Sequence, residues 1–180
     1  MIDLRKRGLP DSIEVDGKAV PVLTDFRVWI AWLHDLEAAK RVPLYIFPEG
    51  VELPPRESWL PSALEFAKSP SATPKAKNAS RDKAFDFVLD GDYIAASFMQ
   101  AYGIDLTECE MHWHLFKALF MSLPGDTKMA QIMGYRLYNP ADAKKKHETV
   151  QASLKDAWKL PSADDAAIIE RQKELFGELL

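Results

Sequence analysis

The sequence predicts a mainly helical protein of the α+β class, with about six helices and a small β-hairpin near its N-terminus. Three observations lead to this prediction. Apolar and aromatic side chains recur at helical spacing over much of the chain. Residues that commonly begin or end helices divide these stretches into separate segments. Alternating apolar and polar residues on both sides of Asp16-Gly17 indicate two short strands joined by a tight turn.

The N-terminal part of the chain is expected to form this hairpin and then a helix. The hairpin covers residues 13–23, with Pro21 near the end of a strand because proline has no N–H to donate. Thr24 or Asp25 caps a helix that continues to about Lys40. The apolar face of this helix consists of large side chains at helical spacing, namely Phe26, Trp29, Trp32, Leu33 and Leu36.

The middle of the chain is rich in proline, with six prolines between residues 43 and 70. Proline removes a backbone donor and interrupts regular structure. We therefore expect only one short helix here, near residues 60–68. The polar, Pro- and Ser-rich residues 69–81 are expected to form a loop.

Five further helices are expected after this loop, and the first two have clear boundary residues. Asp90 or Asp92 caps the first, which ends at Gly103 in a left-handed C-terminal stop. Thr107 and Glu110 have the spacing of a capping box, which predicts a second helix that ends before the next proline, at about residue 123.

The last three helices are predicted from similar signals. Asp126 caps a short helix that stops at Gly134. Asn139-Pro140 begins a helix that continues to about Lys159, since proline suits the first helical position. Pro161-Ser162 opens the final helix.

Length and charge place limits on the kind of protein. A chain of 180 residues suits a single domain, made of a hairpin and helix (about 9–40), a Pro-rich connection and loop (about 43–83), a helical part (about 84–160) and a C-terminal helix (about 162–180). The net charge of −4 argues against binding to nucleic acid or to an anionic membrane. The basic N-terminus is not followed by an apolar run, and no stretch is apolar enough to span a membrane. We expect a cytoplasmic protein.

One cluster of residues resembles a metal site, namely Glu108, Cys109, Glu110, His112 and His114. On a single helix His112 and His114 point in different directions, and Cys109 with His112 supplies only two ligands. We therefore expect a half-buried His112 and an exposed His114 paired with Glu110. No catalytic motif is evident, so we expect no metal, no cofactor and no enzymatic activity. An enzyme or metal protein that uses Cys109 and His112 is the weakest alternative.

The C-terminal helix has an apolar stripe that continues to the last residue. Chain ends usually fray unless they are docked. The stripe therefore either closes the protein's own core or contacts another chain, and both alternatives stay open. The candidate partner-contact residues are Ile168, Ile169, Leu175, Phe176, Leu179 and Leu180.

Four segments together resemble a known family of phage and prophage proteins. They are DFRVWIAWLHDL at 25–36, DGDYIAASFMQAYGIDL at 90–106, HWHLFKALFMSLP at 112–124 and IMGYR at 132–136. The likeness covers most of residues 9–138. The family consists of small tail-module proteins, known mainly from siphophages of Gram-positive hosts and named after a numbered gene product.

The resemblance implies a function in tail assembly. Members are generally encoded next to the tape-measure gene, and proteins at that position typically act as tail assembly chaperones. The implied partners are the tape-measure protein and other tail proteins, with self-association as a further expectation, in the cytoplasm of the bacterial host. The resemblance implies no catalytic residues. The alternative is a structural tail completion or connector component that is retained in the virion.

Overall fold

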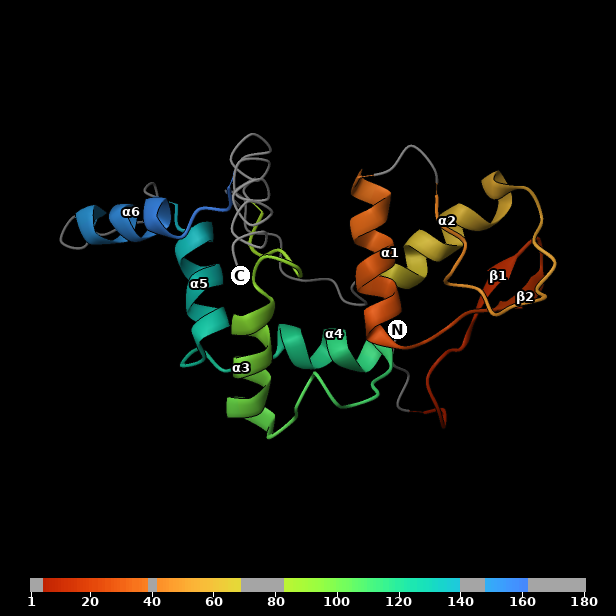
Figure 1. Cartoon of the computed structure of the whole chain (residues 1–180), viewed down its shortest axis with the longest axis horizontal. Coiled ribbons are helices and arrows are strands. Elements are labelled where there is room, and N and C mark those ends of the chain that lie inside the picture. The colour runs from red at the N-terminus through yellow and green to blue at the C-terminus, as the bar shows by residue number, and fades with distance from the viewer. Residues whose placement is uncertain (1–4, 39–41, 69–82, 140–147, 162–180) are drawn as a thin grey trace, which may run out of the picture. The chain divides into compact units, whose positions relative to one another are not determined.

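The computed structural model describes residues 5–38, 42–68, 83–139 and 148–161. Within these residues there are six helices and a two-stranded antiparallel sheet (Figure 1), which confirms the predicted fold class. The chain divides into two compact units. Unit 1 comprises Met1–Lys75 with Ile94–Pro124, and unit 2 comprises Ala76–Tyr93 with Gly125–Leu180.

The N-terminal hairpin forms where the sequence predicts it. Strand β1 (Ser12–Val15) pairs with β2 (Lys18–Pro21) through a two-residue turn. Both turn residues have positive φ angles, 50° at Asp16 and 76° at Gly17, as a tight hairpin turn of this kind requires. Figure 1 shows the hairpin beside α2 (Arg56–Ala67), and Ser62 Oγ of that helix donates to the Glu14 carbonyl at 2.6 Å.

Helices α1 and α2 supply part of the core of unit 1. Helix α1 (Phe26–Ala38) begins after Asp25, whose carboxylate accepts the Arg27 N–H at 2.8 Å, so the predicted boundary is confirmed. Helix α2 begins at Arg56, earlier than predicted, and contains Pro61. Burial of Trp59 and other apolar side chains of α2 therefore outweighs the local cost of a proline inside the helix.

Aromatic side chains fill the core of unit 1. Phe116 on α4 (Trp113–Met121) stacks on Phe26 at 4.6 Å and on Phe98 at 5.3 Å between ring centroids. Phe98 belongs to α3 (Gly91–Tyr102), which ends at Gly103 (φ 66°) as predicted. Four tryptophans of this unit are no more than 2% exposed, namely Trp29, Trp32, Trp59 and Trp113. Burying such large aromatic side chains contributes strongly to the stability of this unit.

The predicted capping box at Thr107 and Glu110 is wrong. Asp105 instead accepts hydrogen bonds from the backbone N–H and the hydroxyl of Thr107, at 2.8 and 2.6 Å, so these residues form a turn. Helix α4 begins only at Trp113, after His112, whose Nδ1 accepts the His114 N–H at 3.0 Å. The cap of α4 is therefore a histidine, a residue that the usual capping preferences do not single out.

Helices α5 and α6 lie in unit 2 and contact each other. Helix α5 (Lys128–Leu137) follows Thr127 rather than the predicted cap Asp126. It also continues past Gly134, which was predicted to stop it. Isolated glycines inside helices cost only about 1 kcal/mol relative to alanine, so packing readily overrides such a stop signal. Helix α6 (Glu148–Ala157) occupies the end of the helix predicted from Pro140 to Lys159.

Candidate functional site

The predicted partner-contact stripe at the C-terminus lies outside the described residues. Its residues are Ile168, Ile169, Leu175, Phe176, Leu179 and Leu180. The stripe therefore stays a prediction from the sequence. The described residues offer three other features that could carry function: a buried polar cluster, exposed apolar side chains and a buried ion pair.

The residues of the suspected metal cluster do not share one helix. Cys109 belongs to the turn that follows Asp105, with its N–H donated to the Asp105 carbonyl at 3.0 Å. His112 caps α4, and its Nε2 donates to the Pro10 carbonyl at 2.9 Å, since Nδ1 is already an acceptor. Among the described residues no group of three or more His, Cys, Asp or Glu side chains could hold a metal ion.

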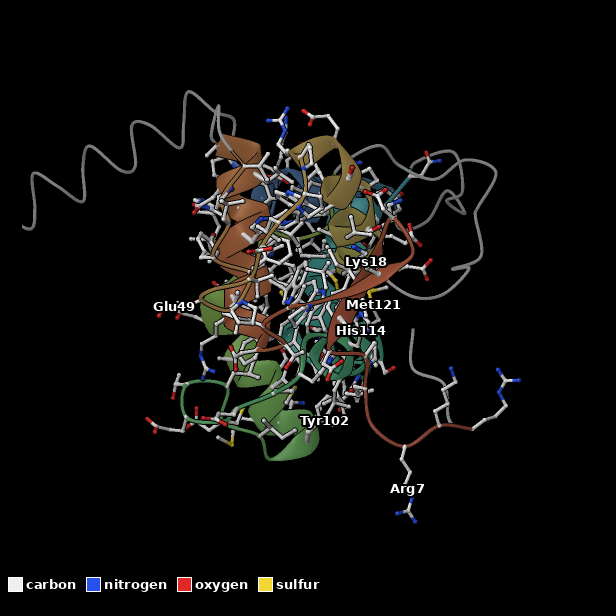
Figure 2. All side chains as sticks on the ribbon, turned by 90° about the vertical axis from the view of Figure 1, so that its right-hand side faces the viewer. Arg7, Lys18, Glu49, Tyr102, His114 and Met121 are labelled. Carbon is white, nitrogen blue, oxygen red and sulfur yellow. The ribbon has the colours of Figure 1, made fainter. Side chains whose placement is uncertain are left out.

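The expectation of an exposed His114 is wrong. Its side chain is 2% exposed and lies against Phe66, with the ring centroids 4.4 Å apart. Its Nε2 donates to the Phe66 carbonyl at 3.1 Å. The error follows from the misplaced start of α4, which put His114 on the wrong face of a longer helix. Figure 2 labels His114 among the side chains packed around α4.

Three side chains from the first turns of α4 bind the carbonyl end of α2. The Trp113 indole N–H donates to the Ala67 carbonyl at 3.3 Å, and His114 binds Phe66. The Lys117 ammonium donates to Phe66 at 3.2 Å and to Ala67 at 3.0 Å, and it also contacts the Lys68 carbonyl. A cation at this position is favourable because the carbonyl end of a helix carries partial negative charge. We call this group of side chains the carbonyl cap.

Burial alters the titration of the carbonyl cap. Desolvation, with a smaller contribution from the neighbouring Lys117 charge, lowers the pKa of His114 to about 4. Desolvation also lowers the pKa of Lys117 to about 8. In the described structure His114 Nδ1 is buried without a hydrogen-bond partner. A second proton on His114 would therefore place an unsatisfied N–H next to the Lys117 ammonium, which explains why the neutral form is favoured.

The depressed pKa of His114 predicts that acid destabilises unit 1. Because the unfolded chain binds a proton near pH 6.5 and the folded chain only near pH 4, stability is present above pH 6.5 and is lost as the pH falls toward 4. We expect a loss of about 2 kcal/mol from this residue. Urea unfolding followed across this range measures it.

The matched variant for this prediction is His114→Gln. Its amide N–H can replace Nε2 as donor to Phe66, but glutamine does not titrate. The variant should lose less stability than the wild type as the pH falls over the same range. Both proteins carry the same carboxylates, so the difference between their pH profiles comes from His114. Identical pH profiles for the two proteins would contradict the assignment.

Unit 1 exposes three apolar side chains on two segments that share a backbone hydrogen bond, namely Leu23, Leu44 and Tyr45, which we call the apolar ledge. Leu44 is 56% exposed, and Leu23 and Tyr45 are exposed to a smaller degree. The backbone of the ledge is held by buried indoles: Trp29 donates to the Leu23 carbonyl at 2.7 Å and Trp32 to the Pro43 carbonyl at 3.0 Å. The Leu23 N–H also donates to the Ile46 carbonyl at 2.7 Å. These hydrogen bonds tie the backbone of the ledge to α1 and tie its two segments to each other.

Unit 2 exposes apolar side chains just before α3. Val88 and Leu89 are 57% and 46% exposed, and the Asp86 carboxylate accepts the N–H groups of both, at 2.9 and 3.0 Å. Burial acts to raise the pKa of Asp86, but these hydrogen bonds and that from Lys83 outweigh it and lower the pKa. These hydrogen bonds stabilise a turn in which the Val88 and Leu89 side chains are exposed.

A buried ion pair connects the start of α3 to α5 within unit 2. Two guanidinium nitrogens of Arg136 contact the two carboxylate oxygens of Asp90 at 2.6 and 2.9 Å. The two side chains are 7% and 3% exposed. Arg136 also donates to the carbonyls of Trp158 and Ala84, at 2.6 and 3.2 Å. Asp90, which was predicted as a helix cap, is therefore the partner of a buried arginine.

The family model described as Bacteriophage Gp15 protein matches residues 62–160, which is more than half of the chain. The chain belongs to this bacteriophage protein family. The match begins inside α2. It covers the carbonyl cap, the Asp90–Arg136 ion pair and α6. No curated protein and no solved structure matches the chain.

The family match and the resemblance identified in the sequence overlap in part. The resemblance extends from residue 9 to 138, whereas the family model starts later and continues to residue 160. The apolar ledge of unit 1 precedes the matched range. None of the helices in the described part of the chain is long and apolar enough to cross a membrane.

Proposed function

We propose that this phage protein is a tail assembly chaperone that holds the tape-measure protein in the host cytoplasm while the tail is built. Membership in the Bacteriophage Gp15 family is the observation that supports the proposal most. The partners would be the tape-measure protein and other tail proteins, and the protein would have no enzymatic activity and need no cofactor.

The exposed apolar surfaces suit this role. A long helical protein with apolar faces aggregates unless those faces are covered before assembly. The apolar ledge, held by two indole hydrogen bonds, offers a preformed surface for such a face. The chain has a net charge of −4, which helps to keep a complex soluble. Several weak contacts of this kind along one tape measure would add up to stable binding.

The proposal predicts that this protein, co-expressed with the tape-measure protein encoded beside it, co-purifies with that protein. Co-expression should also raise the soluble yield of the tape-measure protein. Replacing both Leu23 and Leu44 by Ser should weaken binding about thirtyfold, because each leucine loses about 1 kcal/mol of apolar contact. The double change of Phe176 and Leu179 to Ser tests the predicted C-terminal stripe in the same way. Pull-down and a solubility assay measure both effects.

The matched control is Glu49→Ser, which changes an exposed polar residue close to the apolar ledge in the sequence. Glu49, labelled in Figure 2, is exposed. The control should bind like the wild type. Absence of binding and of any gain in solubility, with both proteins folded, would overturn the chaperone proposal. Detection of the protein in purified virions at a fixed copy number would favour the alternative, a structural completion or connector component.

A further inference from the structure

Helix α4 has apolar side chains on two opposite faces. The face buried in unit 1 carries the aromatic side chains of the helix, namely Trp113, Phe116 and Phe120. The opposite face carries aliphatic side chains at the spacing i, i+3 and i+4, which we call the outer stripe, namely Leu115, Ala118 and Leu119. Leu115 is 40% exposed, and the other two residues are half-buried. The outer stripe is therefore an apolar helix face in contact with solvent.

The outer stripe has no charge. Within Trp113–Met121 only His114 and Lys117 are ionisable, and both belong to the carbonyl cap, where they are 2% and 4% exposed. A helix at the surface of a globular protein typically has charged or polar side chains on its outer side. An outer side of aliphatic residues instead suits contact with a second apolar surface.

Two exposed methionines lie at the edges of the outer stripe. The Tyr102 hydroxyl of α3 donates to the Leu119 carbonyl at 2.9 Å, so the end of α3 lies beside the stripe. Met99, one turn earlier on α3, is 48% exposed, and Met121 at the end of α4 is 52% exposed. Methionine side chains are unbranched and flexible, so they can adapt to different partner surfaces.

The size, spacing and neutrality of this surface favour a single partner helix over a second copy of the chain. A stable dimer buries about 800 Å² on each partner, which is more than a few half-exposed side chains supply. The nine residues of α4 rise by about 13 Å, so they match roughly two to three turns of another helix. Residues at this spacing form ridges that fit the grooves of a second helix. A charged partner side chain would lose its hydration here without gaining a counter-ion from α4.

We propose that the outer stripe binds the apolar face of an amphipathic helix from a partner protein. Leu115 and Leu119 contact that face, and Met99 and Met121 close its edges. The contact is weak and reversible because the surface is small. This surface is distinct from the apolar ledge, and the partner need not be a tape-measure protein, so the two proposals can fail independently.

The test is an NMR titration of the full chain with a synthetic amphipathic peptide, acetyl-QLEALLKQLEALLK-amide in one-letter code. Its leucines line one face of a helix, and its charges sum to zero. The peptide should shift the backbone amides of residues 113–121 with a dissociation constant on the order of 0.1–1 mM. A peptide of the same composition whose leucines are scattered around the helix should shift them far less. Because the outer stripe is uncharged, binding should not weaken as salt is added.

Three variants locate the contact. Leu115→Gln removes the exposed leucine and keeps a good helix former, so it should weaken binding about fivefold or more. Met99→Gln should weaken binding about twofold, because it removes one edge of the same surface. Leu137→Gln makes the same change at a leucine of α5 in unit 2 that is 43% exposed. It is the matched control and should bind like the wild type.

Four outcomes would overturn the proposal. They are the absence of shifts at residues 113–121, equal shifts with the scattered peptide, loss of binding at high salt, and unchanged binding by both Leu115→Gln and Met99→Gln. Self-association of the free chain that Leu115→Gln abolishes would also contradict it, because the surface would then bind a second copy of the chain.

Discussion

Replacement of Arg136 by Met is expected to destabilise unit 2 by about 3–5 kcal/mol, because it leaves the Asp90 carboxylate buried without a counter-ion. Asp90 is 3% exposed, so water cannot replace the lost guanidinium. The carbonyls of Trp158 and Ala84 lose a donor in the same variant. Urea unfolding and amide hydrogen exchange of α5 and α6 measure the loss.

The double variant Arg136→Met with Asp90→Leu separates the two causes of this loss. It removes both charges, so it should recover part of the stability lost in the single variant. Lys68→Met is the control, because it removes the cation of an exposed ion pair. The side chains of Lys68 and Glu65 are 68% and 75% exposed, so this substitution should change the free energy of unfolding very little. If the single and double variants of the buried pair were equally unstable, the cost would come from lost packing rather than from an unpaired charge.

The second large effect is expected from Phe116→Ala, which should destabilise unit 1 by about 3–5 kcal/mol. Phe116 is 1% exposed and lies at the centre of the aromatic core. Its ring centroid is 4.6 Å from that of Phe26, 5.3 Å from Phe98 and 6.1 Å from Phe120. Alanine at this position removes all of these contacts and leaves a cavity that the surrounding rings cannot fill.

The matched variant on the same helix is Met121→Ala. Met121, labelled in Figure 2, is 52% exposed, so its loss should cost well under about 1 kcal/mol. Chemical denaturation of both variants gives the comparison. Similar stabilities for the two would mean that α4 does not hold the core of unit 1 together.

The parts of the fold that follow from local backbone chemistry could be predicted from the sequence. Asp16-Gly17 defines the hairpin because both residues accept positive φ angles, and Gly103 ends α3 for the same reason. The apolar face of α1 follows from helical spacing, and Phe26, Trp29 and Trp32 are buried as expected. Each of these signals lies within a few residues of the feature that it predicts.

The errors arise where distant contacts override local signals. Thr107 and Glu110 have the spacing of a capping box, but Asp105 binds Thr107, and backbone hydrogen bonds from Phe26 and Trp113 fix the start of α4 beside α1. Helix α5 passes Gly134 because its residues pack within unit 2. The contacts of Phe26 and Trp113 join residues that are far apart in the sequence, so local sequence patterns do not predict them.

The polar groups of the candidate site were missed for a similar reason. Asp90 and Arg136 are separated by 46 positions, and both residue types are usually exposed. A weak signal existed for Lys117, which lies at helical spacing from Trp113 and Phe120 on an otherwise apolar face. A charged residue in such a position needs buried acceptors, which here are the carbonyls of α2.

The distribution of tryptophan gives the protein two built-in optical probes. Four indoles are buried in unit 1, whereas Trp158 belongs to unit 2, where its ring contacts Tyr93 and Lys128. Intrinsic fluorescence of the whole chain is therefore weighted toward unit 1. Replacing Trp158 by Phe leaves a spectrum that reports on unit 1 alone, and the difference from the wild type isolates unit 2. The unfolding of each unit can thus be followed without any added label.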